Sequence, residues 1–451
     1  MKNCLKGGLQ TVYAQLIICH NRRLPYQAKI MKQFKSFFVF IVILLSTRIF
    51  NLRVFFIGTM VWDVVVSVLI ITMCLYILFT HPDCFYRKTF LLCLGIFLCS
   101  LIVDTFACFR LNCPYFTVIK AMKFIVPGPM LCFVLYRYYN KESDVEIVCN
   151  ALKYSMIIYL LLQYCAYATH SYTSLFYDEF DSSRYDFTRQ RNFAPCVECF
   201  MILVFVFYLM DIHSKPTLFY KVQKWLYLSM FGYFVVFIFM SKIYLVSIMS
   251  VLFWWVLYKK PVGIVRLLLI MVALISCVLV IDYCARSSDE SIFKHYVDDF
   301  KYDSNHSSWA RQESLTGYYE LFKETKGMGL GHATIHYDRD FAYLAIDRRI
   351  TIYDIGAIGV FYQYGVSMIV LSAIILFYCI DTIIKARVIR DVNVKKLSDC
   401  MSLFLVFIIV SLTPLWLHEI RACVCGLVFY FFMIIEDNIT NRRQVVTSNR
   451  I

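Results

Sequence analysis

Long apolar runs recur along the whole chain and are separated by short polar segments. Each run is about 17–25 residues long, enough for a helix to cross ~30 Å of hydrocarbon at ~1.5 Å per residue. The strands of a membrane barrel would instead give ~10-residue segments of alternating hydrophobicity, and the sequence lacks these. The pattern therefore predicts an all-α fold, a polytopic transmembrane helical bundle with one large, partly helical loop.

About twelve spans are expected from the apolar runs. They lie at about 36–50, 54–80, 89–109, 116–136, 147–168, 193–212, 225–240, 243–258, 263–284, 355–380, 400–417 and 422–436. Basic residues gather in alternate short loops between these spans, as is typical of loops retained in the cytoplasm. The alternation predicts that the N- and C-termini are both cytoplasmic.

This topology divides the chain into five parts. They are a basic cytoplasmic segment at 1–35, transmembrane helices over 36–284 with a periplasmic loop at 169–192, a large periplasmic loop at 285–354, C-terminal transmembrane helices over 355–436 and a cytoplasmic tail at 437–451. Long loops escape the charge rule, so the charges of the large loop do not conflict with its outer location. Met31 begins a second plausible start of translation.

Composition changes the picture only by excluding other classes of protein. The chain is 60% hydrophobic and 17% charged, against about 25% charged in a soluble domain. Its net charge of +14 does not indicate nucleic-acid binding, because the basic residues sit in the loops between spans. Most of the 19 cysteines lie in or beside apolar runs, which argues against a disulfide framework. Cys196 and Cys199 form a CxxC inside an expected span, and we expect no metal or cofactor there.

The large loop contains a segment that we expect to be an amphipathic helix. At 100° per residue, Leu315, Tyr318 and Phe322 share one face, and Arg311 lies on the same face. Glu313, Glu320 and Glu324 cluster on the opposite face, Ser307 or Ser308 can cap the start, and Gly327 can end the helix.

Arg311 has two interpretations. A guanidinium on an apolar face either extends to water or pairs with a carboxylate, which is a structural role, or it meets an anionic ligand. The run Gly327-Met328-Gly329-Leu330-Gly331 follows this helix. Because no strand precedes it and no Lys-Ser or Lys-Thr follows it, we interpret it as a tight turn and not as a nucleotide site.

Other basic residues fall near the same expected outer face. Arg189 and Arg191 end the shorter outer loop, Lys242 lies at an outer turn, and Lys120 and Lys123 lie in an expected span. Ionisable groups at membrane depth usually face a bundle interior or a cavity. Each residue alone is compatible with a structural role. Together they suggest an anionic ligand, such as a lipid-linked phosphate or pyrophosphate, held by charge-assisted hydrogen bonds.

Three residues of the large loop are candidates for acid–base chemistry. Asp354 either caps the following span or accepts a proton. His332 and His336 are possible bases, although loop histidines are more often simply exposed.

The order of these motifs resembles the O-antigen polymerase and O-antigen ligase superfamily of bacterial inner-membrane proteins. The matching pieces are Arg189-Gln190-Arg191-Asn192-Phe193-Ala194-Pro195, Ser241-Lys242, Trp309-Ala310-Arg311 with the glycine run, and Asp354-Ile355-Gly356 through Gly365. Ala194 stands where family members often carry an acidic residue, and Lys242 where they often carry Arg. The resemblance covers roughly 185–370.

The resemblance implies a function at the periplasmic face of the inner membrane. It implies metal-independent, inverting polymerisation of undecaprenyl-pyrophosphate-linked oligosaccharide units into O-antigen, capsule or exopolysaccharide. Arg311, Lys242, Arg191 and Arg189 would hold the pyrophosphate, and Asp354, His332 or His336 would be catalytic. The expected partners are the lipid-linked oligosaccharide, membrane lipid and a chain-length regulator protein. Two alternatives stay open: an O-antigen ligase, and a flippase or transporter for lipid-linked oligosaccharide.

Overall fold

The computed structural model of the chain describes eleven helices, and within the described residues there is no strand. The described residues are 59–80, 87–110, 112, 114–169, 200–201, 203–204, 208, 218–235, 242–259, 306–332, 355–389, 391–413, 415–417 and 421–448. The helices are α2 (Thr59–Thr80), α3 (Lys88–Arg110), α4 (Phe116–Ile125), α5 (Pro127–Tyr138), α6 (Glu142–Ala168), α9 (Leu218–Tyr233), α10 (Lys242–Lys259), α13 (His306–Glu324), α16 (Ala357–Val388), α17 (Val392–Ser411) and α18 (Ala422–Ser448). The predicted all-α fold is confirmed for this part of the chain.

Four of the described helices are long and apolar enough to cross a membrane. They contain the segments Lys88–Arg110, Asp144–Cys165, Ala357–Val388 and Ala422–Thr440. Shorter apolar segments are Val64–Thr80 and Val246–Trp255. The described residues thus support a helical membrane protein with four of the roughly twelve expected spans. The expected spans at 36–50 and 263–284, and nearly all of the one at 193–212, lie outside the described residues.

Two consecutive helices occupy the stretch expected as one span at 116–136. Val126 separates α4 from α5, and Pro127 is the first residue of α5. Proline has no backbone N–H and its ring blocks the preceding turn, so a helix that meets it must stop or kink. The apolar pattern continues across the break, which is why periodicity alone merges the two helices.

The starts of α5 and α18 pack with very close backbone contact. A Cβ added to Gly128 would lie 2.5 Å from the Ala422 carbonyl carbon, and one added to Gly426 would lie 3.0 Å from the Leu131 Cβ. Small residues at such positions let membrane helices approach closely. The pair is fixed further along by the Tyr430 hydroxyl, which donates to the Tyr139 carbonyl at 2.7 Å.

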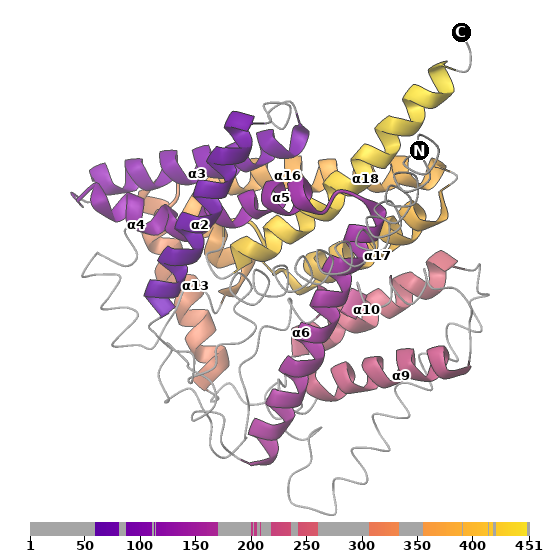
Figure 1. Cartoon of the computed structure of the whole chain (residues 1–451). Coiled ribbons are helices and arrows are strands. Elements are labelled where there is room, and N and C mark those ends of the chain that lie inside the picture. Colours follow the sequence, from indigo (N-terminus) through magenta and orange to yellow (C-terminus); the bar gives the residue numbers. More distant parts are fainter. Residues whose placement is uncertain are drawn as a thin grey trace, which may run out of the picture.

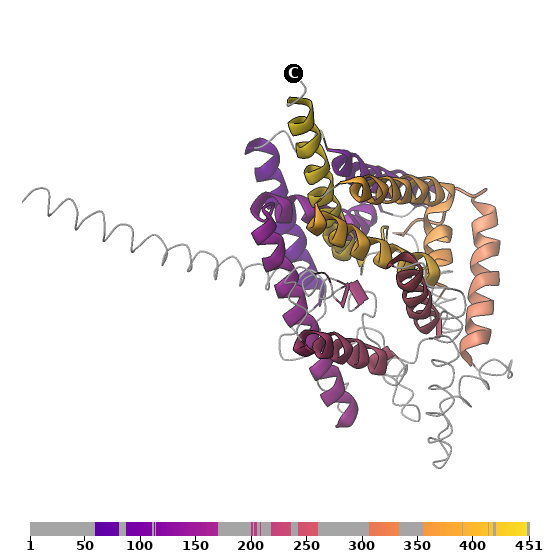
Figure 2. The same cartoon turned by 90° about the vertical axis from the view of Figure 1, so that its right-hand side faces the viewer.

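Helices α3 and α16 run antiparallel (Figures 1 and 2) and define two ends of the bundle. At one end, Thr89 meets Tyr378. Ten residues further along α3, Cys99 meets Ser367. Helix α13 lies across the opposite end in both views. We call the first the basic end and the second the α13 end. Eight basic residues lie at helix ends of the basic end: Arg87, Lys88, Arg137, Lys141, Lys385, Arg387, Lys395 and Lys396.

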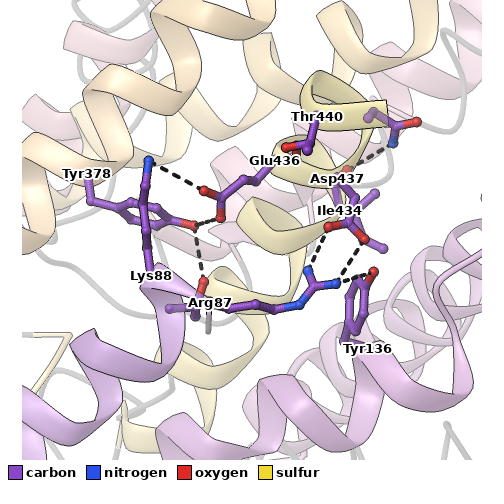
Figure 3. A network of polar contacts seen from close by, with 10 residues as sticks. Arg87, Lys88, Tyr136, Tyr378, Ile434, Glu436, Asp437 and Thr440 are labelled. Carbon is purple, nitrogen blue, oxygen red and sulfur yellow. Dashed lines mark hydrogen bonds and ion pairs between the residues drawn. The ribbon is translucent and has the colours of Figure 1, made fainter. Parts of the chain in front are cut away.

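A polar network joins α3, α5, α16 and α18 at the basic end (Figure 3). Arg87 donates to both carboxylate oxygens of Asp437, at 2.7 and 3.3 Å, and to the Tyr136 hydroxyl at 2.9 Å. Lys88 pairs with Glu436 at 3.6 Å, and the Tyr378 hydroxyl donates to the same carboxylate at 3.2 Å. The network fixes the start of α3 against α18.

The substitution Asp437→Asn is expected to lower the free energy of unfolding by about 1.5–3 kcal/mol, because the half-buried Arg87 loses its charged acceptor. Thermal unfolding of the purified protein in detergent measures the effect. Lys385→Gln is the matched control, since its partner Asp381 lies one turn away on the same helix and such pairs contribute only about 0.3–0.5 kcal/mol. Equal losses in the two variants would contradict a special role for the network.

Candidate functional site

Helix α13 packs its apolar face onto the first turns of α16. Tyr318 and Phe322 are buried with Leu330 and Tyr362, and Leu315 is partly buried beside them. The Phe322 ring lies 5.4 Å from the Tyr362 ring, centroid to centroid, and the Tyr362 hydroxyl donates to the Leu315 carbonyl at 3.4 Å. The predicted apolar face is therefore confirmed, and α16 is what it covers.

The other expectations for α13 are met in part. Glu320 and Glu324 are exposed as predicted, whereas Glu313 is half-buried and one of its carboxylate oxygens is covered. The helix begins at His306, which places Ser307 and Ser308 within its first turn. Arg311 is one turn before Leu315 on the same helix, and its side chain lies outside the described residues.

The glycine run after α13 is a compact turn, as predicted. Thr325 organises it: its carbonyl accepts from the Met328 N–H at 3.1 Å and its hydroxyl accepts from the Gly329 N–H at 3.3 Å. Gly327, Gly329 and Gly331 all have positive φ, at 82°, 100° and 77°. Glycine adopts this conformation without steric cost, which explains the alternate glycines of the motif.

The turn closes onto a break in α16. Gly365, with φ 61° and ψ −148°, interrupts α16 eight residues after the start of the helix. The break removes the helical backbone hydrogen bonds around Gly365. The turn replaces them: the N–H groups of Leu330 and Gly331 donate to the carbonyls of Tyr362 and Gln363 at 2.9 and 2.8 Å, and Val366 N–H donates to the Gly327 carbonyl at 3.1 Å. Irregular backbone at membrane depth needs such internal partners, because lipid offers none.

Both faces of this junction require glycine. A Cβ on Gly329 would lie 2.5 Å from the Gln363 carbonyl oxygen, and one on Gly365 would lie 2.7 Å from the Met328 carbonyl carbon. Real Cβ atoms essentially never come so close to backbone. The glycine run is therefore a backbone-to-backbone joint between α13 and α16.

His332 follows the joint directly and is buried, with 2% of its surface exposed. The expectation that loop histidines are exposed is wrong for this residue, because the joint pulls it against α16. Its Nδ1 lies 3.2 Å from the side-chain nitrogen of Gln363, which is 1% exposed. If the Gln363 amide N–H donates, Nδ1 accepts and Nε2 carries the ring proton. If the amide is turned so that its oxygen accepts, Nδ1 carries the ring proton and Nε2 has the lone pair. In both cases Nε2 is the ring nitrogen turned away from Gln363.

The start of α10 connects to the same end of the bundle. Lys242 is the first residue of α10, and its side chain lies outside the described residues. Two residues later, the Tyr244 hydroxyl accepts from Thr413 at 3.5 Å, and the neighbouring Leu412 carbonyl accepts from the Ala357 N–H at 3.0 Å. The chain of contacts links the start of α10, the end of α17 and the start of α16.

The remaining predicted site residues lie outside the described residues. They are Asp354, His336, Arg189 and Arg191. Gly356, two residues after Asp354, occupies the N-cap position of α16. In the described ranges, no group of three or more His, Cys, Asp and Glu side chains is arranged to hold a metal ion.

Sequence analysis missed Gln363. The available signal was an amide inside an otherwise apolar span, two residues before a glycine. A polar side chain at that depth needs a partner. The partner is His332, which lies 31 residues earlier in the chain, so no periodicity argument can connect the two.

The geometry defines a helical membrane protein with a polar junction at the α13 end of its bundle. No protein-family model matches the chain, and no curated protein or solved structure is significantly similar to it.

Proposed function

We propose that the protein is a membrane glycosyltransferase that polymerises undecaprenyl-pyrophosphate-linked oligosaccharide units at the periplasmic face. The observation that supports this is the convergence at the α13 end. There the buried His332–Gln363 pair, the helix carrying Arg311, the start of α10 at Lys242 and the start of α16 come together. These are the segments that carry the candidate acid–base and cationic groups.

The distribution of charge supports a periplasmic location for this end. Eight Lys and Arg residues lie at helix ends of the basic end, and basic residues near span ends are typically cytoplasmic. The α13 end is opposite, so it would face the periplasm. No sugar nucleotide is available there, and the donor glycan must arrive on a lipid carrier.

The proposed reaction uses charge stabilisation at a leaving diphosphate. Arg311, Lys242, Arg191 and Arg189 would bind the pyrophosphate, whose developing negative charge fixed cations stabilise. An acceptor sugar hydroxyl would attack the anomeric carbon with inversion as the bond from that carbon to the pyrophosphate oxygen breaks. Its proton would pass to His332, Asp354 or His336, and undecaprenyl pyrophosphate would leave. His332 can act as the base through Nε2 when the Gln363 amide oxygen accepts from Nδ1–H, because the lone pair then lies on Nε2.

An elongation assay tests the proposal. Proteoliposomes containing the protein are supplied with undecaprenyl-pyrophosphate-linked repeat units, and the products are separated by length. The proposal predicts a ladder of longer chains. Transfer only onto lipid A core would indicate a ligase, and movement of intact units across the bilayer without elongation would indicate a flippase.

Arg311→Ala is expected to lower the initial rate of elongation by about 100-fold or more, the size of loss seen when one charge-stabilising donor is removed from an active site. Arg311→Lys should retain part of the rate, since it keeps the charge but loses the bidentate fork. Lys323→Ala, an exposed cation on the same helix, should elongate normally. A ladder unchanged in Arg311→Ala would exclude the assigned role.

A further inference from the structure

Arg421 immediately precedes α18, and the residues on both sides of it are held in place. On one side, the Trp416 indole N–H donates to the Ser372 hydroxyl of α16 at 2.7 Å, and Leu415 and Leu417 are buried. On the other side, Ala422 packs directly against Gly128. The backbone at Arg421 is therefore fixed by packing on both sides. Arg421 does not lie on a loose surface loop.

Helix lengths place Arg421 within one bilayer thickness of the basic end. Asp437, in the network of the basic end, lies sixteen residues further along α18, which is about 24 Å of helix and less than the ~30 Å of hydrocarbon. From Gly128, next to Ala422, α4 extends ten residues back toward the α13 end, about 15 Å. Val118 and Cys108 belong to one cluster, which places the start of α4 beside the last turn of α3.

Arg421 is half-buried and the Nε of its guanidinium is fully covered. Among the residues that the structure describes, no group accepts a hydrogen bond from that nitrogen. It also lies at the N-terminus of a long helix, where the macrodipole disfavours a cation. A charged group at membrane depth is costly and usually marks a ligand path. Three separate costs at one residue point to an anion that arrives from outside the chain.

We propose that Arg421 binds the diphosphate of the polyprenyl carrier, an inference that rests on the proposed function. The site lies below the α13 end, within the bundle, where a carrier would present its head group while its chain stays in lipid. Helix α4, which carries Lys120 and Lys123, leads from this level to the α13 end. A diphosphate bound here would accept charge-assisted hydrogen bonds from the guanidinium.

Binding of undecaprenyl pyrophosphate, without sugars, to the full-length protein in phosphatidylcholine nanodiscs tests the proposal. Arg421→Gln is expected to weaken binding at least about tenfold and Arg421→Lys less, because a lysine keeps the charge. Arg387→Gln, which removes an exposed arginine at the basic end, should bind as the wild type does. Binding of undecaprenol, which lacks phosphate, should be the same in all four proteins.

Two outcomes would overturn the site. One is wild-type affinity of Arg421→Gln for undecaprenyl pyrophosphate. The other is an equal dependence on Arg421 for phosphatidylglycerol, which would make the site a contact for bulk anionic lipid. Binding of undecaprenyl pyrophosphate needs no acceptor sugar. A protein that binds this lipid through Arg421 but makes no ladder would therefore contradict the proposed polymerisation and not the Arg421 site. A protein that makes a ladder but binds the lipid independently of Arg421 would contradict the Arg421 site and not the proposed polymerisation.

Thermal unfolding separates a ligand-binding arginine from a structural one. Without undecaprenyl pyrophosphate, Arg421→Met is expected to unfold at the same or a higher temperature than the wild type, because an uncompensated charge is removed. With the lipid present, only the wild type should gain stability. A clear fall in the unfolding temperature of unliganded Arg421→Met would show that the guanidinium has a partner in the protein, and would contradict the proposal.

Discussion

Gly365→Ala is expected to be the most destabilising single substitution at the α13 end. The added Cβ would overlap the backbone of Gly327 and Met328, and the positive φ is itself unfavourable for alanine. We expect a loss of roughly 3 kcal/mol or more, since neither backbone can retreat without breaking the joint. Thermal unfolding measures the loss. Limited proteolysis of the α13 segment should show faster cleavage, because α13 loses its attachment to α16.

Gly232→Ala is the matched control for this experiment. Gly232 lies within α9, and a Cβ there would meet no atom within 4 Å. Alanine favours helix over glycine by about 1 kcal/mol, so this variant should be as stable as the wild type or slightly more stable. If Gly365→Ala were as stable as Gly232→Ala, the joint between the glycine run and α16 would not exist in the folded protein.

His332→Ala is expected to reduce the turnover of elongation by about 10²–10⁴-fold, the usual contribution of a general base. His332→Gln should lose as much activity, since an amide does not accept the proton. Binding of the lipid-linked donor should change little in both variants. The measurement is the initial rate of ladder formation over a range of pH, in which the wild type should lose activity as the imidazole is protonated.

Substitution of Gln363 separates the chemistry of His332 from its packing. Gln363→Glu keeps a hydrogen-bond acceptor beside Nδ1 and should retain a large part of the activity, whereas Gln363→Leu removes the partner and should lose most of it. Loss in His332→Ala together with an unchanged pH profile in its residual activity would indicate that another residue, such as Asp354 or His336, is the base.

Local patterns in the sequence predicted the parts of this end that depend on a few neighbouring residues. The spacing of Leu315, Tyr318 and Phe322 identified the buried face of α13, and alternate glycines identified a turn. The break in α16 was not predictable in the same way. A lone glycine in an apolar run is compatible with a continuous helix, and only the bonds from the glycine run make the break at Gly365 stable.

Positions that depend on tertiary contact were missed or misread for the same reason. Asp354 stays a candidate cap or proton acceptor, whereas the N-cap of α16 is Gly356, whose geometry involves the Leu412 carbonyl of a distant segment. Sequence analysis did not single out Arg421, which lies between two apolar runs. Its significance comes from tertiary packing on both sides, where Trp416 bonds to Ser372 and Ala422 packs against Gly128.

Photo-crosslinking tests the central claim most directly, namely that the α13 end binds a lipid-linked diphosphate. An undecaprenyl-pyrophosphate analogue with a diazirine near the diphosphate is irradiated with the protein in nanodiscs, and the labelled peptides are identified by mass spectrometry. The account predicts labels in 306–332 and at the starts of α10, α16 and α18. Labels gathered around Arg87 and Asp437, or no label above that of an undecaprenol analogue, would contradict it.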